Sequence, residues 1–156
     1  MQMKAINGED TLCFEPAQEV NALRGQSLVK LSNVSVAEAN AKLLSLTSDA
    51  SLDVIVRFRP QALGKVNFNI RSIQFSYDSA TKILKRADTS SELHPGESVD
   101  ARFLVDRGIV ESFWNQGEVA FSIGSLHTDI GPAFSLDGNA VVEELVIYPM
   151  ADIWKK

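Results

Sequence analysis

The sequence lacks the residues that most often tie a small fold together or attach it to nucleic acid. It has one cysteine, Cys13, in 156 residues, so no disulfide can form within the chain. Its 15 Lys and Arg against 20 Asp and Glu give a net charge of −5, and no basic cluster interrupts the sequence. We therefore expect no nucleic-acid partner, because phosphates require a basic face.

Long apolar runs are also missing. No segment approaches the ~20 apolar residues of a membrane-spanning helix, so we expect no membrane partner. Residues 1–10 lack the apolar centre of a signal peptide. A turn at residues 7–10 leads directly into a strand, which is typical of a piece of a longer protein and leaves localisation open. The length is that of one domain.

Short alternating segments dominate the chain. Residues 65–71 place Val66, Phe68 and Ile70 on one face, and residues 73–77 repeat this pattern. Further strands are expected at residues 27–31, 52–58, 82–85, 101–105, 109–114, 119–123, 133–136 and 140–148. The turn at residues 137–139 predicts that the last two strands form a pair. One short helix is expected within residues 36–46, which are rich in helix-forming residues.

This pattern predicts an all-β fold, a two-sheet antiparallel β-sandwich of the jelly-roll or concanavalin-like kind with little helix. Alternation places in the core Phe103, Val105, Phe113, Phe121, Leu145 and Ile147. The strand at residues 101–105 also carries Leu104 on its other face. That side chain either covers a loop or meets another domain, because a free-standing sandwich buries one face of each strand.

Residues 101–118 read Ala-Arg-Phe-Leu-Val-Asp-Arg-Gly-Ile-Val-Glu-Ser-Phe-Trp-Asn-Gln-Gly-Glu. This segment resembles the signature hairpin of the C-terminal β-sandwich of glycoside hydrolase family 32, the levanase, inulinase and invertase-type β-fructosidases. It departs from the signature at Gly108, where the family has Ser, and at Trp114, where a smaller residue is common. Residues 15–24, 83–88 and 143–154 resemble other family segments in the same order. Gly108 is expected to adopt a positive φ angle.

The resemblance implies a parent protein that hydrolyses β-fructofuranosyl bonds in sucrose, levan or inulin and is secreted or periplasmic. Family 32 enzymes carry their catalytic carboxylates on a five-bladed propeller, in Asn-Asp-Pro, Arg-Asp-Pro and Glu-Cys motifs. This chain has no Asp-Pro dipeptide, and Leu12 precedes Cys13. We therefore expect a non-catalytic module, with residues 1–24 as the remnant of an interdomain linker with a first strand and residues 25–156 as the sandwich. Its expected partners are the parent's propeller and a second copy in a homo-oligomer.

Asp106 and Glu111 are the carboxylates best placed for catalysis, since they lie on the two arms of one hairpin. A structural role is preferred, with Asp106 bonding the turn backbone and Arg107 pairing with Glu111. His94 and His127 lack metal-ligand spacing to each other or to Cys13, so we expect neither metal nor cofactor.

The alternative function is a carbohydrate-binding module for fructans. Trp114, Asn115 and Gln116 combine an aromatic ring with two amides, as sugar-binding sites do, which makes them candidate sugar contacts. The structural alternative places Trp114 in the core or at a domain boundary. The interdomain role predicts an apolar patch near residues 14–24, with Trp114 a candidate member.

Overall fold

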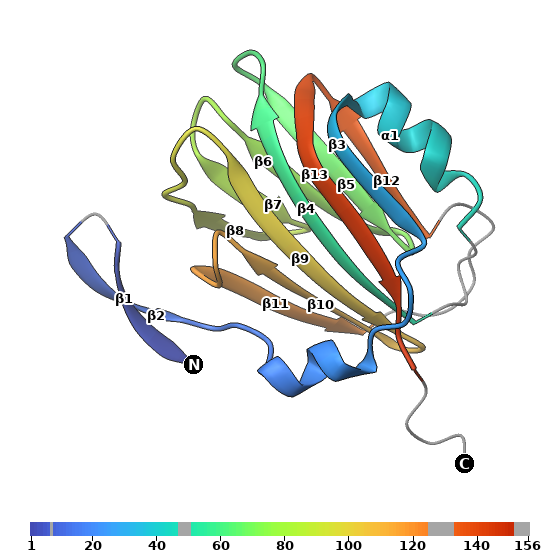
Figure 1. Ribbon diagram of the computed structural model, residues 1–156. Helices are drawn as coiled ribbons and strands as arrows, with labels where there is room; N and C mark the ends of the chain where they lie inside the picture. The colour runs from blue at the N-terminus through green and yellow to red at the C-terminus, as the bar shows by residue number, and fades with distance from the viewer. Residues whose placement is uncertain (7, 47–50, 125–132, 152–156) are drawn as a thin grey trace.

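The computed structural model describes residues 1–6, 8–46, 51–124 and 133–151. These residues form an antiparallel β-sandwich of a six-stranded and a five-stranded sheet, with a separate N-terminal hairpin (Figure 1). The strand orders are β11-β10-β9-β4-β13-β3 and β12-β5-β6-β7-β8, and β1 pairs with β2. The expected all-β sandwich with little helix is confirmed.

The elements have the following bounds. The hairpin and the six-stranded sheet comprise β1 (Gln2–Ile6), β2 (Glu9–Cys13), β3 (Val29–Ser35), β4 (Leu52–Pro60), β9 (Val99–Asp106), β10 (Ile109–Trp114), β11 (Val119–Gly124) and β13 (Ala140–Pro149). The five-stranded sheet comprises β5 (Lys65–Ile70), β6 (Ile73–Asp78), β7 (Ile83–Arg86), β8 (Thr89–Glu92) and β12 (Phe134–Gly138). The helices are the 3₁₀ helix η1 (Gln18–Leu23) and α1 (Val36–Leu43).

The core between the sheets is built around aromatic rings. The fully buried indole of Trp114 lies with its ring centroid 5.2 Å from that of Phe68, 5.6 Å from Phe75 and 5.4 Å from Phe103. Such tilted and edge-on pairs add to the stabilisation from apolar burial. The expected core positions Phe103, Val105, Leu145 and Ile147 are confirmed as buried.

Two expectations about this core and its turns are wrong. Phe113 lies on the outer face of β10, half-buried, because the alternation of that strand turns Val110, Ser112 and Trp114 inward instead. Phe121 does pack against the core, with its ring centroid 5.9 Å from that of Phe75, but it is only partly buried because β11 is the edge strand of its sheet. Gly108 does not have a positive φ angle.

The last two strands do not form the expected pair. β12 pairs with β5 in the five-stranded sheet, whereas β13 pairs with β3 and β4 in the six-stranded sheet. The turn at residues 137–139 therefore carries the chain from one sheet to the other. Gly138 has a φ of 117°, and a Cβ at this position would overlap the backbone carbonyl of Lys65.

The expected short helix is confirmed as α1. Ser35 and Glu38 form a capping box, in which each side chain accepts a hydrogen bond from the backbone N–H of the other residue. On this helix, the side chain of Asn40 donates to the Leu136 carbonyl (2.7 Å) and accepts from the Leu136 N–H (3.0 Å). Because α1 follows β3, this contact ties the edges of the two sheets together.

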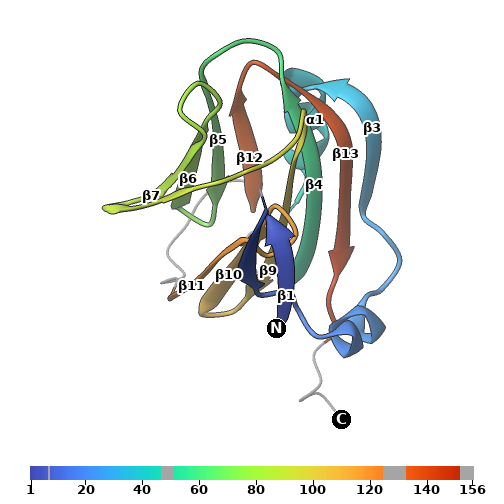
Figure 2. The ribbon, with the colours of Figure 1, turned by 90° about the vertical axis from the view of Figure 1, so that its left-hand side faces the viewer.

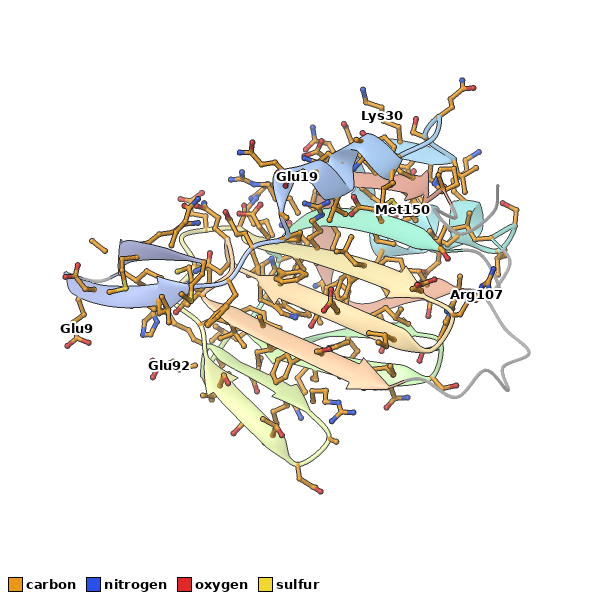
Figure 3. The ribbon with its side chains drawn as sticks, turned by 90° about the horizontal axis from the view of Figure 1, so that it is seen from below. Glu9, Glu19, Lys30, Glu92, Arg107 and Met150 are labelled. Atoms are coloured by element: carbon orange, nitrogen blue, oxygen red, sulfur yellow. The ribbon has the colours of Figure 1, made fainter. Side chains whose placement is uncertain are left out.

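The two outer faces of the sandwich lie on opposite sides of the molecule. Figure 2 shows β5, β6 and β7 away from η1, and Figure 3 shows Glu19 of η1 on the opposite side from Glu92 of β8. We call the outer face of the six-stranded sheet the covered face, because residues 14–24 run over it, and that of the five-stranded sheet the open face. Among the described residues, no helix is long and apolar enough to cross a membrane.

Candidate interdomain surface

The N-terminal hairpin is attached to the sandwich at the turn between β10 and β11. The backbone N–H of Phe14 donates to the carbonyl of Gly117 (2.9 Å). The Lys4 ammonium donates to the carbonyl of Gln116 (2.8 Å) and to a carboxylate oxygen of Glu15 (2.9 Å). A two-stranded sheet has little stability of its own, so these contacts fix where the hairpin lies.

This turn requires glycine at position 117. Asn115, Gln116 and Gly117 all have positive φ angles, of 48°, 58° and 84°. A Cβ at Gly117 would overlap the backbone carbonyl of Phe14. The turn and the incoming chain therefore approach backbone to backbone, which only glycine allows.

Glu118 ties the same turn to the loop that precedes β9. Its side chain is 5% exposed and accepts hydrogen bonds from the His94 backbone N–H (3.1 Å) and from the Asn115 amide. The His94 ring Nδ1 lies 2.5 Å from the carboxylate. Burial, reinforced by the nearby carboxylates of Asp78 and Glu118, raises the pKa of Tyr77. The Asn115 amide therefore donates to Glu118 within the protein, and it would have to give up this hydrogen bond to donate to a sugar.

A buried carboxylate joins η1 to the covered face. Asp53 is fully buried and accepts hydrogen bonds from Arg24 Nε (2.7 Å) and from Arg102 Nε and Nη2 (2.9 and 2.8 Å). Arg102 also donates to the side-chain oxygen of Asn21 on η1 (2.9 Å). The Arg24 guanidinium stacks 4.6 Å above the ring of Tyr148. Two arginines from separate segments therefore compensate the buried charge of Asp53 and lock η1 onto the sheet.

A pocket of about 290 Å³ lies between the incoming chain and the covered face, bounded by Pro16, Gln18 and Phe113 among others. The half-buried Phe113 side chain forms part of the wall of this pocket, beneath the incoming chain. Asp100 also lines it, and burial raises the pKa of that carboxyl against the opposing effect of Arg57.

An apolar groove of about 540 Å³ lies beside η1 near the turn between β9 and β10. Its apolar lining comprises Val20, Leu23, Leu52, Leu104, Val105, Ile109, Met150 and Ala151. Figure 3 shows Arg107 at this end of the six-stranded sheet, with Glu9 at the far tip of the hairpin. The outward Leu104 side chain therefore lines a groove next to residues 14–24, on the side of the sheet that η1 partly covers.

The signature hairpin residues Asp106, Arg107 and Glu111 all line this groove. The Asp106 carboxylate accepts hydrogen bonds from the Ser51 hydroxyl (2.8 Å) and the Arg107 backbone N–H (2.8 Å). These two bonds hold the pKa of Asp106 below its ordinary value. The Arg71 guanidinium donates to the Asp106 backbone carbonyl (2.5 Å). Asp106 thus stabilises its turn, and the pairing of Arg107 with Glu111 stays a prediction.

Of the three candidate sugar contacts, Trp114 is fully buried and lies in the aromatic core. Its indole Nε1 has no hydrogen-bond partner among the described residues. A sugar could stack on this ring only if the core opened, and Trp114 is not a member of any surface patch. The carbonyl of Gln116 accepts from Lys4. Sugar contact at this turn stays a prediction with no support from its geometry.

Sequence reasoning missed the anchoring roles of Lys4, Asp53 and Gly117. The sequence does contain a sign that Asp53 is buried and paired, because Asp53 is the one charged residue in the otherwise apolar stretch at residues 52–56. A charge at such a position predicts a buried partner. Among the described residues, no cluster of His, Cys, Asp or Glu could hold a metal ion. His127 and Trp154, the last residue of the family-like segment 143–154, lie outside the described part of the chain.

The family described as "Glycosyl hydrolases family 32 C terminal" matches residues 19–124. Among curated proteins, no sequence matches. The chain is similar in structure to an exo-inulinase from Aspergillus awamori (TM-score 0.71, 18% identity, 97% of this chain and 35% of that chain). It is also similar to a sucrose-6-phosphate hydrolase from Lactobacillus gasseri (TM-score 0.67, 14% identity, 96% and 32%).

A third similar structure is fructan 1-exohydrolase IIa from Cichorium intybus (TM-score 0.65, 14% identity, 92% of this chain and 38% of that chain). At these identities the likeness shows the fold. The chain spans about a third of the length of each of these structures.

Proposed function

The chain belongs to the C-terminal domain family of family 32 glycosyl hydrolases, and on that premise we propose that it is a non-catalytic sandwich module that packs on and stabilises a catalytic domain. The parent activity we propose is hydrolysis of β-fructofuranosyl bonds, as in the inulinase and fructan exohydrolase of similar fold. Residues 1–24 would be the connecting segment and residues 25–156 the sandwich.

The observation that carries this proposal is the apolar face of the N-terminal hairpin. Met3 and Leu12 are cross-strand partners and are 61% and 42% exposed. Alternation along the chain places Met1 and Phe14 on the same side, with exposures of 79% and 45%. Four large apolar side chains on an otherwise unpaired two-stranded sheet are typical of a contact surface.

The attachment of the hairpin supports the same role. Its position is fixed by Lys4, Phe14 and Gly117, and η1 is fixed by Asp53. A segment that only connected two independent domains would not need a buried ion pair or a backbone-to-backbone contact. The anchors would hold the apolar face of the hairpin in one orientation, which a rigid interface between domains requires.

Sedimentation velocity tests the proposal, using the chain mixed with a purified family 32 catalytic domain from the same genome. We expect a one-to-one complex that the double variant Met3→Asp/Leu12→Asp abolishes. The matched control is Leu44→Asp/Leu63→Asp, which places the same charges at exposed apolar residues outside the hairpin. Self-association of the chain through the hairpin, with no binding of the catalytic domain, would contradict the proposal and favour an oligomer contact.

A further inference from the structure

The open face carries a groove of about 550 Å³ that runs across β12, β5, β6 and β7, and most of its outward side chains are polar. The strand register arranges its side chains in two rows. One row is Ser135, Asn69 and Gln74, and the other is Asp137, Asn67, Ser76 and Lys85, in each case directly paired across neighbouring strands. Neighbouring strands lie about 4.8 Å apart, so each row presents a polar group at every strand spacing.

The groups in these rows can both donate and accept hydrogen bonds. Amides carry two donors and an acceptor, and hydroxyls carry one donor and two lone pairs. Among the described residues, the side chains of Asn69, Gln74, Ser76 and Ser135 have no hydrogen-bond partner, and Asn67 has a long contact of 3.4 Å to Asp137. Their hydrogen-bonding capacity is therefore available to a ligand.

Residue choice on this face does not follow from strand stability. Asn is disfavoured in β-strands, where Thr and other β-branched residues are preferred. Yet Asn67 and Asn69 occupy successive outward positions in β5, in the middle of the groove, and both are half-buried. Since the Asn69 side chain makes no hydrogen bond within the described protein, no such bond offsets this cost.

We propose that this groove on the open face binds a neutral oligosaccharide. Among the described residues that line the groove, Lys85 is the one cation and Asp137 the one anion, and they balance each other, so this lining has no preference for a charged ligand. Sugar hydroxyls both donate and accept, as the lining amides and hydroxyls do, and hydroxyls across one sugar ring are spaced similarly to neighbouring strands. Binding rests on hydrogen bonds alone, because the ring of each aromatic residue in the lining, Phe68 and Phe75, is buried.

This site shares no lining residue with the N-terminal hairpin, which projects from one end of the sandwich (Figure 3). It also differs from the turn at Asn115 and Gln116, whose groups are engaged within the protein. The inference therefore does not depend on whether the hairpin contacts a catalytic domain, and each proposal fails or stands by its own experiment.

The test is a titration of the ¹⁵N-labelled chain, followed by amide chemical shifts, with an inulin-type fructo-oligosaccharide in one arm and maltotriose in the other. We expect saturable shifts confined to β5, β6, β7 and β12. A response to the fructan arm, the glucan arm or both supports the site and identifies the sugar. Absence of saturable shifts with either sugar up to about 50 mM, where a millimolar ligand saturates, would overturn it. Shifts that map to another surface would overturn it too.

Two variants separate ligand binding from folding. Asn69→Thr replaces the amide by a better strand former, and we expect an unchanged or higher Tm with affinity reduced more than fivefold. Ser135→Ala in the groove should also weaken binding. Its matched control is Ser122→Ala, the same change at an outward position of β11 on the covered face. Equal affinity of Asn69→Thr and the unaltered chain would overturn the assignment of the groove.

Discussion

The covered face and the open face belong to sheets that share one core, yet they differ in how they use polar residues. On the covered face, polar side chains are paired with one another, as Asp53 is with Arg24 and Arg102. On the open face, Asn69 and Gln74 stand side by side without partners among the described residues. Paired and buried polar groups hold the chain's own segments in place, whereas unpaired ones in a groove are available to bind another molecule.

The largest expected loss of stability comes from the core between the two faces, and it gives a scale for the losses on each face. Phe103→Ala removes a fully buried ring and should lower the free energy of unfolding by about 3–5 kcal/mol. Phe113→Ala, on the covered face, should lower it by less than half as much, because that ring is only partly removed from water. Urea unfolding measures both, and equal losses would contradict the placement of Phe113 outside the core.

Removing one carboxylate from each face tests the contrast directly. Asp53→Ala leaves Arg24 and Arg102 without their buried partner and should cost about 3 kcal/mol, at the lower end for broken buried pairs because the arginines are 20% exposed. Asp137→Ala on the open face should change stability by less than about 0.5 kcal/mol. Urea unfolding measures both, and similar losses of unfolding free energy in the two variants would contradict the contrast between paired and unpaired polar groups on the two faces.

Gly117→Ala should release the hairpin while leaving the sandwich folded. The left-handed backbone at this position costs about 1–2 kcal/mol for a residue with a Cβ, and the overlap with Phe14 adds to it. Limited proteolysis should then cut near residues 14–17 faster than in the unaltered chain. Gly108→Ala is the control, because Gly108 lacks a positive φ angle and has open space around it. Equal cleavage of both variants would refute the anchor.

The smallest effect concerns the Asp106 turn at the edge of the covered face. Ser51→Ala removes the hydrogen bond that lowers the pKa of Asp106 most, so this pKa should rise toward its ordinary value. Because the folded-state pKa is lowered, the Asp106 carboxylate contributes stability above its ordinary pKa and loses it as the pH falls through the folded value. Carboxyl NMR titration measures the shift, and an unchanged pKa would contradict the role of Ser51.

The sequence predicts the sandwich and most of its strands, because alternation in single strands is local. It fails where a shift of one residue in the alternation decides which side chain faces the core. Phe113 and Trp114 are both large, apolar and adjacent, so alternation alone does not say which one enters the core. The pairing of β10 with β9 decides it, because Trp114 lies beside the buried Ala101 and Phe113 lies beside Arg102.

The features of the two faces depend on contacts between segments that are far apart in the chain, so local sequence patterns alone do not predict them. The turn at Gly117 is visible in the sequence, but its reason is Phe14, which lies about a hundred residues away in the chain. The polar positions of β5 and β6 follow from alternation. Their alignment with Ser135 and Asp137 depends on the pairing of β12 with β5, which crosses nearly half the chain. Because β12 also lies in the other sheet from β13, the turn at Gly138 gave a misleading local signal.

Amide hydrogen exchange of the chain, with and without a family 32 catalytic domain from the same genome, tests most directly whether the hairpin and the covered face form the interdomain surface. We predict slower exchange in β1, β2 and η1 on binding, because those elements carry the exposed apolar residues and the anchors of the covered face. Exchange in β5, β6 and β7 should stay unchanged. Protection of the open face, with the hairpin exchanging as fast as in the isolated chain, would contradict the account.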